Sequence, residues 1–326
     1  MIKIGNNKGN SIYKQNWVLA ITTFKQKQAE MTQEKSKKIF LIINKYAGHG
    51  LGDRVVDLIL PFLKKHHFSV AYSFTQHPGH ATELARKASV EGFGLVVAVG
   101  GDGTVNEVAQ GLIGTGTVMG IIPMGSGNGL ARELGISMNM LKSARSLIEG
   151  VDIYLDVCRL NDQRFLCTSG IGFDALIAHK MSKSSSRGFL KYIQLVIQES
   201  IFYQPLEVRM KIDGVLIEKS VFLITFANAS QFGNNAYIAP GASMSDGLID
   251  VVLVKKFSKL WMPVFAVALF TKLIPRLPFV DRYKARHIEL EQADTPYYHF
   301  DGEPGHLNVP AKIKLDSKKI FVRGVQ

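Results

Sequence analysis

Short apolar runs alternate with longer amphipathic segments between residues 39 and 122. The apolar or alternating runs are typical of strands, and the segments with apolar residues every three to four positions are typical of helices. The predicted strands are 39–43, 69–75, 95–99 and 118–122, and the predicted helices are 53–65 and 80–90. This alternation predicts a doubly wound, mostly parallel sheet with helices on both faces.

The pattern changes after about residue 151, where strands follow one another with fewer helices between them. Such a pattern predicts an antiparallel, β-rich second domain. The expected strands are 153–160, 164–168, 206–212, 221–227, 248–254, 287–290 and 306–315. A last strand at 319–323 is placed to return to the first domain. We therefore expect an α/β domain at 38–152 plus about 317–326, and a β-rich domain at 153–316.

Residues 1–37 show no clear period and end in a run of polar residues. We interpret them as a flexible extension. Met31 stands just before the first predicted strand and is an alternative start of the protein. A basic arm that touches a membrane is the other interpretation.

The composition is that of an ordinary globular chain. The 326 residues are 46% apolar and 20% charged, which suits two domains and not disorder. The net charge of +12 favours anionic partners, such as nucleotide phosphates, nucleic acid or a membrane surface. Cys158 and Cys167 fall in apolar runs without metal-ligand spacing, so we expect reduced core residues and a cytoplasmic location. The longest apolar run, 260–270, is well short of the ~18–20 residues of a membrane helix.

Glycine-rich turns follow three of the predicted strands of the first domain. They are Asn44–Gly50, Gly100–Glu107 and Pro123–Arg132. Glycine lets backbone N–H groups crowd around an anion, and a helix that begins after the turn adds its positive end. Because the carboxyl ends of parallel strands meet at one edge of a sheet, the three turns predict a polyphosphate site.

Two familiar nucleotide motifs are excluded by the residues themselves. The chain has no Gly-Lys-[Ser/Thr] sequence, so the turns are not a Walker P-loop. Gly101 and Gly103 are followed by Asn106 where a dinucleotide-binding fold requires glycine. Gly125 and Gly127 are likewise followed by a leucine, so a hydride-transfer Rossmann enzyme is excluded.

The stretch Gly100-Gly-Asp-Gly-Thr-Val-Asn-Glu107 resembles the nucleotide-binding motif of the diacylglycerol kinase catalytic-domain family. That family includes bacterial lipid kinases, sphingosine kinases and ceramide kinases. NAD kinases share the motif and phosphofructokinases have a similar one, so four further segments carry the specificity. They follow in family order as Pro123–Arg132, Ser169–Ala175, Asp246–Asp250 and Asp301–Glu303.

The resemblance extends from about residue 38 to the C-terminus and implies both a fold and an activity. The implied fold has an N-terminal doubly wound α/β nucleotide-binding domain of the NAD-kinase and phosphofructokinase type. An antiparallel β-rich domain follows, with the active site in the cleft between them. The implied activity is ATP- and Mg²⁺-dependent phosphorylation of a lipid hydroxyl, on diacylglycerol or a sphingoid-type lipid.

The resemblance also assigns the residues that line the ATP site. Turn amides are expected to hold the phosphates, while Asn44 and Thr75 are expected to face the nucleoside. The full set is Asn44, Lys45, Tyr46, Ala47, Gly48, Thr75, Gly100, Gly101, Asp102, Gly103, Thr104, Val105, Asn106, Gly125, Ser126 and Asn128.

Three carboxylates are candidates for the catalytic machinery. Asp102 needs a cation between itself and a phosphate, which suits a role in the Mg²⁺ network, and a role as base or as a helix cap is the alternative. Asp301 and Glu303 lie in a turn between two strands, and residues two apart in extended chain share a face. Either one is placed to accept the proton of the substrate hydroxyl.

The resemblance implies a structural Mg²⁺ site and a substrate contact in the second domain. Asp246 would supply a carboxylate and Ser243 and Leu248 their carbonyls, although Asp-Gly is also simply a good turn. The second glycine turn, Gly125–Leu130, is closer to that of sphingosine and ceramide kinases than to the bacterial pattern. Asp174 matches a region that holds the lipid head group, where it would pair with a sphingoid amine or else cap a helix.

The substrate implies contact with a membrane during turnover. Residues 261–279 mix large apolar side chains with Lys259, Lys272 and Arg276 nearby, as in an interfacial element with a basic rim, or a packed core element with a basic edge. The sequence shows no nucleic-acid-binding motif. It leaves a homodimer open, and it leaves as alternatives a NAD-kinase-like enzyme and an ATP-binding pseudokinase with a scaffold role.

Overall fold

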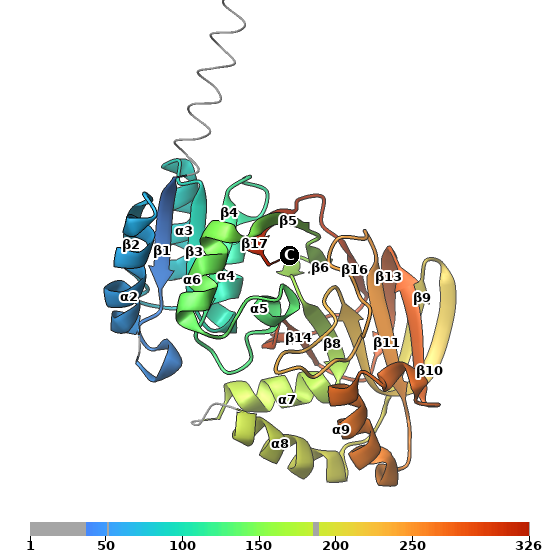
Figure 1. Ribbon diagram of the computed structural model, residues 1–326. Coiled ribbons are helices and arrows are strands. Elements are labelled where there is room, and N and C mark those ends of the chain that lie inside the picture. Colours follow the sequence, from blue (N-terminus) through green and yellow to red (C-terminus); the bar gives the residue numbers. More distant parts are fainter. Residues whose placement is uncertain (1–36, 51, 185–188, 326) are drawn as a thin grey trace, which may run out of the picture.

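The computed structural model describes residues 37–50, 52–184 and 189–325. The predicted flexible extension, residues 1–37, lies outside the described part of the chain apart from Lys37. Two domains follow one another (Figure 1), an α/β domain and a β-rich domain with helices at its lower end. The predicted fold class is confirmed.

The α/β domain is built on a sheet that, over the described residues, has six strands in the order β2-β1-β3-β4-β17-β5. The first five are parallel and β5 is antiparallel to β17. The strands are β1 (Lys38–Ile43), β2 (Ser69–Phe74), β3 (Leu95–Gly100), β4 (Val118–Pro123), β5 (Val151–Leu155) and β17 (Ile320–Gly324). The helices are η1 (Ala47–His49), α2 (Gly52–Lys65), α3 (His80–Val90), α4 (Asp102–Leu112), α5 (Gly129–Glu133) and α6 (Met140–Glu149).

The central strands are buried on both faces because helices cover each side. Successive residues of β3 point to opposite faces, so Val97 packs against α2 and α6 whereas Val96 packs against α3 and α4. The apolar positions that predicted α2, such as Ile59 and Leu63, are fully buried on its inner side. The sequence pattern therefore set both the strands and the helix faces of this domain.

The β-rich domain is an antiparallel sheet of eleven strands over the described residues. Its main path runs β15-β14-β8-β10-β9-β13-β16-β6-β7, and β11 and β12 branch from β10. The strands are β6 (Cys158–Leu160), β7 (Gln163–Phe165), β8 (Thr168–Gly172), β9 (Leu206–Ile212), β10 (Val215–Ala227), β11 (Ile249–Lys255), β12 (Val280–Ala285), β13 (His287–Ala293), β14 (Tyr297–Phe300), β15 (Glu303–His306) and β16 (Ala311–Leu315).

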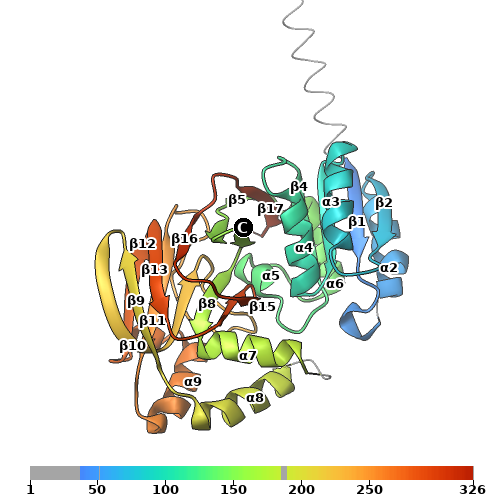
Figure 2. The same cartoon turned by 180° about the vertical axis from the view of Figure 1, so that it is seen from behind.

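Three helices gather at one end of this sheet, as Figures 1 and 2 both show. They are α7 (Phe173–Ser182), α8 (Phe189–Phe202) and α9 (Met262–Thr271), and the short turns η2 (Lys259–Trp261) and η3 (Ile274–Arg276) flank α9. Their inner side chains share one buried cluster, which includes Ile177, Leu195 and Phe265. None of the described helices is long and apolar enough to cross a membrane.

Three of the predicted strands, 153–160, 164–168 and 306–315, are each divided in the structure, the last between the end of β15 and β16. The predicted strand 153–160 becomes β5 in one sheet and β6 in the other, because the chain leaves the first sheet at Asp156. The N–H of Asp156 donates to the carbonyl of Met244, and its buried carboxylate accepts from the N–H of Gly247 and pairs with Lys319. The predicted strand 164–168 is likewise divided between β7 and β8.

Candidate active site

The three glycine-rich turns meet at one edge of the α/β sheet, as expected from the parallel strands they follow. The turns after β3 and β4 touch through Gly101 and Gly125. A Cβ on Gly125 would stand 2.7 Å from the Cα of Gly101, so glycine is required for the backbones to approach this closely. The turn after β1 joins them where Gly48 lies against Met124 and the amide of Asn44 donates to Thr104 Oγ1 at 3.3 Å.

Asp102 links two of these turns. It begins α4, and its carboxylate accepts N–H bonds from Asn128 at 2.8 Å and Gly129 at 2.7 Å, where α5 begins. The carboxylate therefore caps a helix as one alternative predicted, but the helix is α5, far along the sequence. A Cβ on Gly127 would lie 2.7 Å from Asp102 Oδ2, so glycine at this position leaves room for the carboxylate to reach the start of α5.

Asn128 holds the second turn in shape. Its side chain accepts the N–H of Gly125 at 2.9 Å and donates to the carbonyl of Gly125 at 2.6 Å, and its own backbone is left-handed with φ of 50°. The side chain is buried, and its amide is occupied by these two hydrogen bonds. Asn128 is predicted to contact the nucleotide, and in the structure its side chain shapes the turn.

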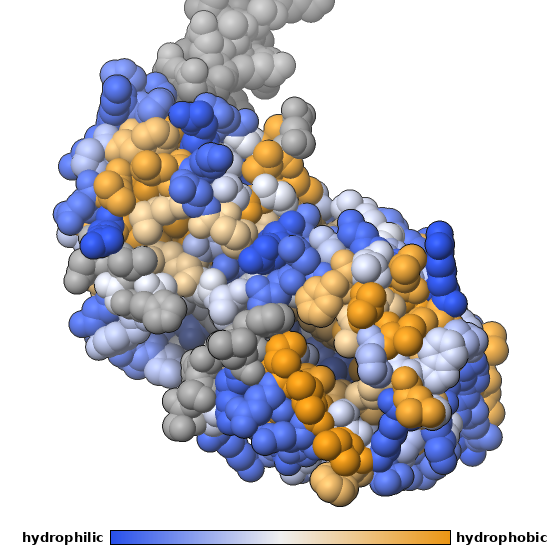
Figure 3. Space-filling model, turned by 60° about the horizontal axis from the view of Figure 1, so that its bottom comes forward, coloured by the Kyte–Doolittle hydropathy of each residue, from blue (hydrophilic) through white to orange (hydrophobic). Residues whose placement is uncertain are grey.

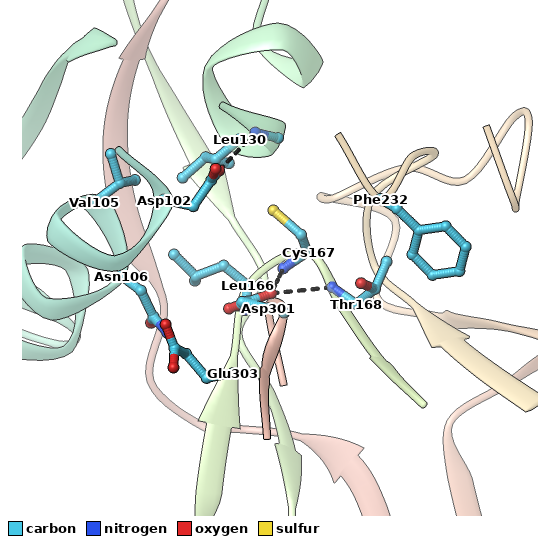
Figure 4. A pocket seen from close by; sticks show the side chains of 12 residues that line it. Asp102, Val105, Asn106, Leu130, Leu166, Cys167, Thr168, Phe232, Asp301 and Glu303 are labelled. Atoms are coloured by element: carbon cyan, nitrogen blue, oxygen red, sulfur yellow. Dashed lines mark hydrogen bonds between the residues drawn. The ribbon is translucent and has the colours of Figure 1, made fainter. Parts of the chain in front are cut away.

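A pocket of about 250 Å³ lies between the two domains beside these turns. The α/β domain contributes α4 and the start of α5, and the β-rich domain contributes the chain between β7 and β8, the 232 region and the β14–β15 hairpin (Figure 4). The pocket holds all three candidate carboxylates. Its lining is Asp102, Val105, Asn106, Gly129, Leu130, Leu166, Cys167, Thr168, Phe232, Asp301, Gly302 and Glu303.

Asp301 faces the backbone of the β-rich domain. Its carboxylate accepts the N–H groups of Leu166, Cys167 and Thr168 at 2.8, 2.7 and 3.1 Å. Leu166 and Cys167 lie between β7 and β8 and Thr168 is the first residue of β8, so the Asp301 carboxylate satisfies the N–H groups where one strand ends and the next begins. Burial raises the pKa of the Asp301 carboxyl above its ordinary value, and the three N–H donors act in the opposite direction.

Glu303 is exposed and projects into the pocket. A Cβ on Gly103 would lie 3.8 Å from Glu303 Oε1, so this carboxylate stands opposite the first turn of α4. Figure 4 shows Glu303 beside Asn106, whereas Asp301 is turned toward Cys167 and Thr168. The expectation that both carboxylates share one face of extended chain is wrong. Asp301 and Gly302 have φ of 48° and 84°, so the chain turns at this point instead of extending.

Several other predicted ATP-site residues lie at the rim of the three turns. Thr75 follows β2, and its N–H donates to the carbonyl of Ile43 at the end of β1. Lys45, Tyr46 and Ser126 are exposed, and Lys45 Nζ stands 5.1 Å from the ring centre of Tyr46. Thr104 and Val105 are buried under the turn, and Val105 also lines the pocket. No contact with a nucleotide is assigned to them by the geometry alone.

Asp174 lies behind the pocket, in a buried polar cluster. Its carboxylate is 3.2 Å from His299 Nε2, accepts from Thr225 Oγ1 at 3.3 Å, and accepts the N–H of Ala175 at 2.8 Å. The ring of Phe232, which lines the pocket, packs edge-on against His299. The carboxylate is thus already compensated by neighbours of its own domain.

The residues predicted to hold a structural Mg²⁺ do not fit that ion well. Lys284 Nζ lies 2.7 Å from Asp246 Oδ2 and 3.7 Å from a carboxylate oxygen of Asp250. The other oxygen of Asp246 accepts the N–H of Leu248. An ammonium group therefore already balances the charge of this turn, which includes Ser243, and the hydrogen bond to Asp246 raises the pKa of Lys284. Among the described residues no cluster of three or more acidic, histidine or cysteine ligands is present.

Sequence reasoning missed Phe232 and Cys167 as residues of the pocket. No local motif marks them, because both are brought to the site by the packing of the second domain against the first. Leu130, which ends the glycine motif Gly125–Leu130, also lines the pocket. Burial raises the pKa of the Cys167 thiol well above its ordinary value, with the charges of Asp301 and Asp102 adding to the effect. Cys167 is therefore a neutral wall of the pocket and not a nucleophile.

The two domains define a protein with a pocket between an α/β half, which carries three glycine-rich turns at one sheet edge, and a β-rich half. Family models identify the class of protein. Residues 38–160 match the diacylglycerol kinase catalytic domain, and residues 168–322 match the YegS C-terminal NAD kinase beta sandwich-like domain. The chain belongs to this family of lipid kinases, which comprises the diacylglycerol kinases and the YegS-like lipid kinases.

Individual relatives span most of the chain. A YegS-like lipid kinase of Chromohalobacter salexigens is 30% identical over 245 residues, which cover 73% of this chain and 78% of the relative. The diacylglycerol kinase of Bacillus subtilis (strain 168) is 27% identical over 277 residues, which cover 83% of this chain and 91% of the relative. A solved structure of a diacylglycerol kinase from Bacillus anthracis str. Sterne has the same fold, with a TM-score of 0.70 at 23% identity over 88% of this chain and 97% of that one.

Proposed function

We propose that this protein transfers the γ-phosphoryl group of ATP to the hydroxyl of a membrane lipid, with diacylglycerol as the preferred class. The observation that carries the proposal is the position of Glu303. Its carboxylate projects into a pocket whose opposite wall is formed by glycine-rich turns suited to a polyphosphate. A base and a phosphate cradle on two sides of one pocket are what hydroxyl phosphorylation requires.

The phosphates would be held by the backbone of the turns. Gly101 and Gly103 carry N–H groups at the start of α4, and a helix N-terminus favours an anion. The side chains that line the pocket include three carboxylates and, among the described residues, no Lys or Arg. Carboxylates alone repel a triphosphate, so the donor set favours a nucleotide that arrives with a divalent cation.

Asp102 is the residue best placed to hold that cation. Its oxygens accept two N–H bonds and still have lone pairs directed at the pocket, where Mg²⁺ bound with ATP would neutralise phosphate charge. The chain itself positions the reactants. The two turns that touch at Gly101 and Gly125 fix the phosphates, and the interdomain pocket limits the access of water to them.

Glu303 is the proposed base, and Asp301 is a positioning residue. Glu303 takes the proton of the lipid hydroxyl while the hydroxyl oxygen attacks the γ-phosphorus of ATP. The bond between the γ-phosphorus and the bridging oxygen of the β-phosphate breaks, and ADP leaves. Asp301 has its carboxylate engaged by three N–H groups, which fixes the turn that presents Glu303.

Two observations bear on the acceptor. The carboxylate of Asp174 already has His299 and Thr225 as partners, which weakens the case for pairing with a sphingoid amine. Named relatives such as that of Bacillus subtilis are diacylglycerol kinases. Both support a neutral lipid hydroxyl as the acceptor. NAD phosphorylation and a purely scaffolding role remain the competing functions.

The test is a transfer assay with labelled ATP and Mg²⁺ against diacylglycerol, sphingosine, ceramide and NAD in mixed micelles. We expect label in diacylglycerol and a turnover about 10²–10⁴-fold lower for Glu303→Gln. The control variant is Glu107→Gln, since Glu107 caps α3 away from the pocket by accepting the N–H of Ala81. Label in NAD alone, or ATP binding without transfer to any acceptor, would refute the proposal.

A further inference from the structure

Helix α9 is apolar on every side but buried on only one. Its ten residues, Met262–Thr271, include no charged residue. Phe265 and Ala268 pack into the core, while Val264, Val267 and Phe270 are exposed, Val267 by 60%. A helix that is apolar all round is normally enclosed by protein or lipid. Nothing in the described part of the chain covers this outer side.

The neighbouring elements continue the same apolar surface. On α8, Ile197 and Ile201 are exposed and Phe202 is 81% exposed, and in η2 Leu260 is 88% exposed. The start of η2 adjoins the end of α8, since Lys259 Nζ donates to the carbonyl of Ile201. We call this surface the α8–α9 face. It comprises Ile197, Ile201, Phe202, Leu260, Trp261, Val264, Val267 and Phe270.

Figure 3 views the molecule from the side on which these helices lie, and exposed apolar side chains gather there in several clusters. Single apolar residues on a surface are ordinary, but a group contributed by three adjacent elements marks an interaction site. The α8–α9 face therefore has the character of a docking surface.

Positive charge surrounds the face. Residues 255–276 include five basic residues and no acidic one, namely Lys255, Lys256, Lys259, Lys272 and Arg276. Lys255 is paired with Asp281 at 2.9 Å, so the other four supply the charge of the rim. On α8 the one acidic residue, Glu199, is paired with Lys180 at 2.6 Å. An apolar centre with a basic rim matches a lipid bilayer that carries anionic head groups, and it matches an acidic or apolar protein surface less completely.

The face is connected to the active-site pocket by one short segment. The N–H of Tyr237 donates to the carbonyl of Leu269 in α9 at 2.7 Å, and Lys272 Nζ stands 4.4 Å from the Tyr237 ring centre. A few residues earlier in the same segment, Phe232 lines the pocket and also packs against the cluster beneath α9. A lipid that leaves the bilayer at this face would therefore be close to the pocket.

We infer that the α8–α9 face is a membrane-docking surface that seats the protein on an anionic lipid bilayer. The short apolar helix α9 lies in the interface plane, since ten residues are too few to span the hydrocarbon core. The basic residues of the rim contact the lipid head groups. The inference rests on the proposed lipid substrate for its purpose, but bilayer binding itself needs no catalysis.

The test measures sedimentation of the full chain with vesicles in the absence of ATP. One set of vesicles is phosphatidylcholine and the other includes phosphatidylglycerol. We expect binding to the anionic vesicles to fall about ten-fold for Val267→Asp and for Leu260→Asp. The matched control is Val90→Asp, an exposed valine at the end of α3 in the other domain, which is expected to bind as the unmodified protein does. Leu260 is so exposed that its replacement removes almost no packing.

A charge variant distinguishes the contribution of the basic rim to binding from that of the apolar centre. Lys256→Glu is expected to weaken binding to the anionic vesicles and leave the weaker binding to phosphatidylcholine unchanged. Unchanged binding by both Val267→Asp and Leu260→Asp would overturn the inference, as would an unmodified protein that binds neither vesicle. A protein that dimerises through the face, with dimerisation lost and vesicle binding kept in Val267→Asp, would also overturn it. Vesicle binding without phosphoryl transfer would refute the kinase proposal alone.

Discussion

Asp301 and Glu303 lie two positions apart, yet their carboxylates occupy opposite environments. A left-handed turn at Asp301 directs its side chain back onto three backbone N–H groups, whereas Glu303 begins β15 and faces the pocket. The sequence motif shows two acids but not which one is free. The backbone conformation of one residue decides it.

Asp301→Asn is expected to destabilise the protein by about 1–3 kcal/mol. The three N–H groups donate to two carboxylate oxygens in the unmodified protein, whereas the amide of asparagine has only one acceptor oxygen. Thermal melting of the variant measures the destabilisation. Glu303→Gln is the matched control and is expected to melt within about 0.5 kcal/mol of the unmodified protein, since Glu303 is exposed. Equal loss of stability in the two variants would show that Asp301 has no special structural role.

Lys284 suggests that the turn around Asp246 does not depend on a metal ion. Its ammonium group already balances the carboxylates of Asp246 and Asp250. We therefore expect the melting temperature without nucleotide to be the same in EDTA as in Mg²⁺. A fall in EDTA that is absent from Asp246→Asn would instead locate a bound metal at this turn.

At the scale of elements, the phosphate cradle consists of turns that hold one another. Periodicity located the five parallel strands of the α/β domain to within a residue or two, and glycine composition located the turns that follow three of them. Periodicity placed most of β5 in the second domain. Neither signal could show that Asp102 in one turn caps α5 in another, since that contact joins residues 26 and 27 positions apart. Helix α8 and strand β12 also carry no distinct local pattern and were not predicted.

Gly125→Ala is expected to separate the two turns. The added methyl group would meet the Cα of Gly101 at 2.7 Å, and since both are backbone the clash costs about 1–3 kcal/mol. We expect a lower melting temperature and a higher KM for ATP. Gly103→Ala is the control for stability, because its methyl group finds no atom nearer than 3.8 Å. A Gly125→Ala protein with unchanged KM and melting temperature would contradict the close contact of the turns.

At the scale of the whole molecule, charged pairs secure the chain where it passes from one domain to the other. Asp316 lies between β16 and β17, and its carboxylate accepts from Arg164 at 2.6 Å. Burial acts to raise the pKa of Asp316, but the hydrogen bonds from Arg164 and from the N–H of Lys318 outweigh it and hold the pKa below its ordinary value.

Because the pKa of Asp316 is lowered, the stability of the folded protein depends on pH in the acidic range. A carboxyl group whose pKa is lower in the folded state stabilises the fold above the unfolded pKa, and that contribution is lost as the pH falls through the folded value. We expect the contribution of this pair to the melting temperature to be constant above about pH 5 and to decrease below about pH 4. Asp316→Asn should melt lower at neutral pH and show a shallower fall in acid. An identical fall in both proteins would assign the acid sensitivity to other groups.

Strand β17 lies between β4 and β5 in the sheet of the first domain, although it comes from the far end of the sequence. During synthesis, the α/β domain therefore keeps an open sheet edge until residues 320–324 have left the ribosome. Contacts of such long sequence separation form slowly, and an unpaired edge invites wrong pairing in the meantime. A gene fragment that ends with the catalytic-domain match at residue 160 would lack this strand, so the kinase half is not a transplantable module.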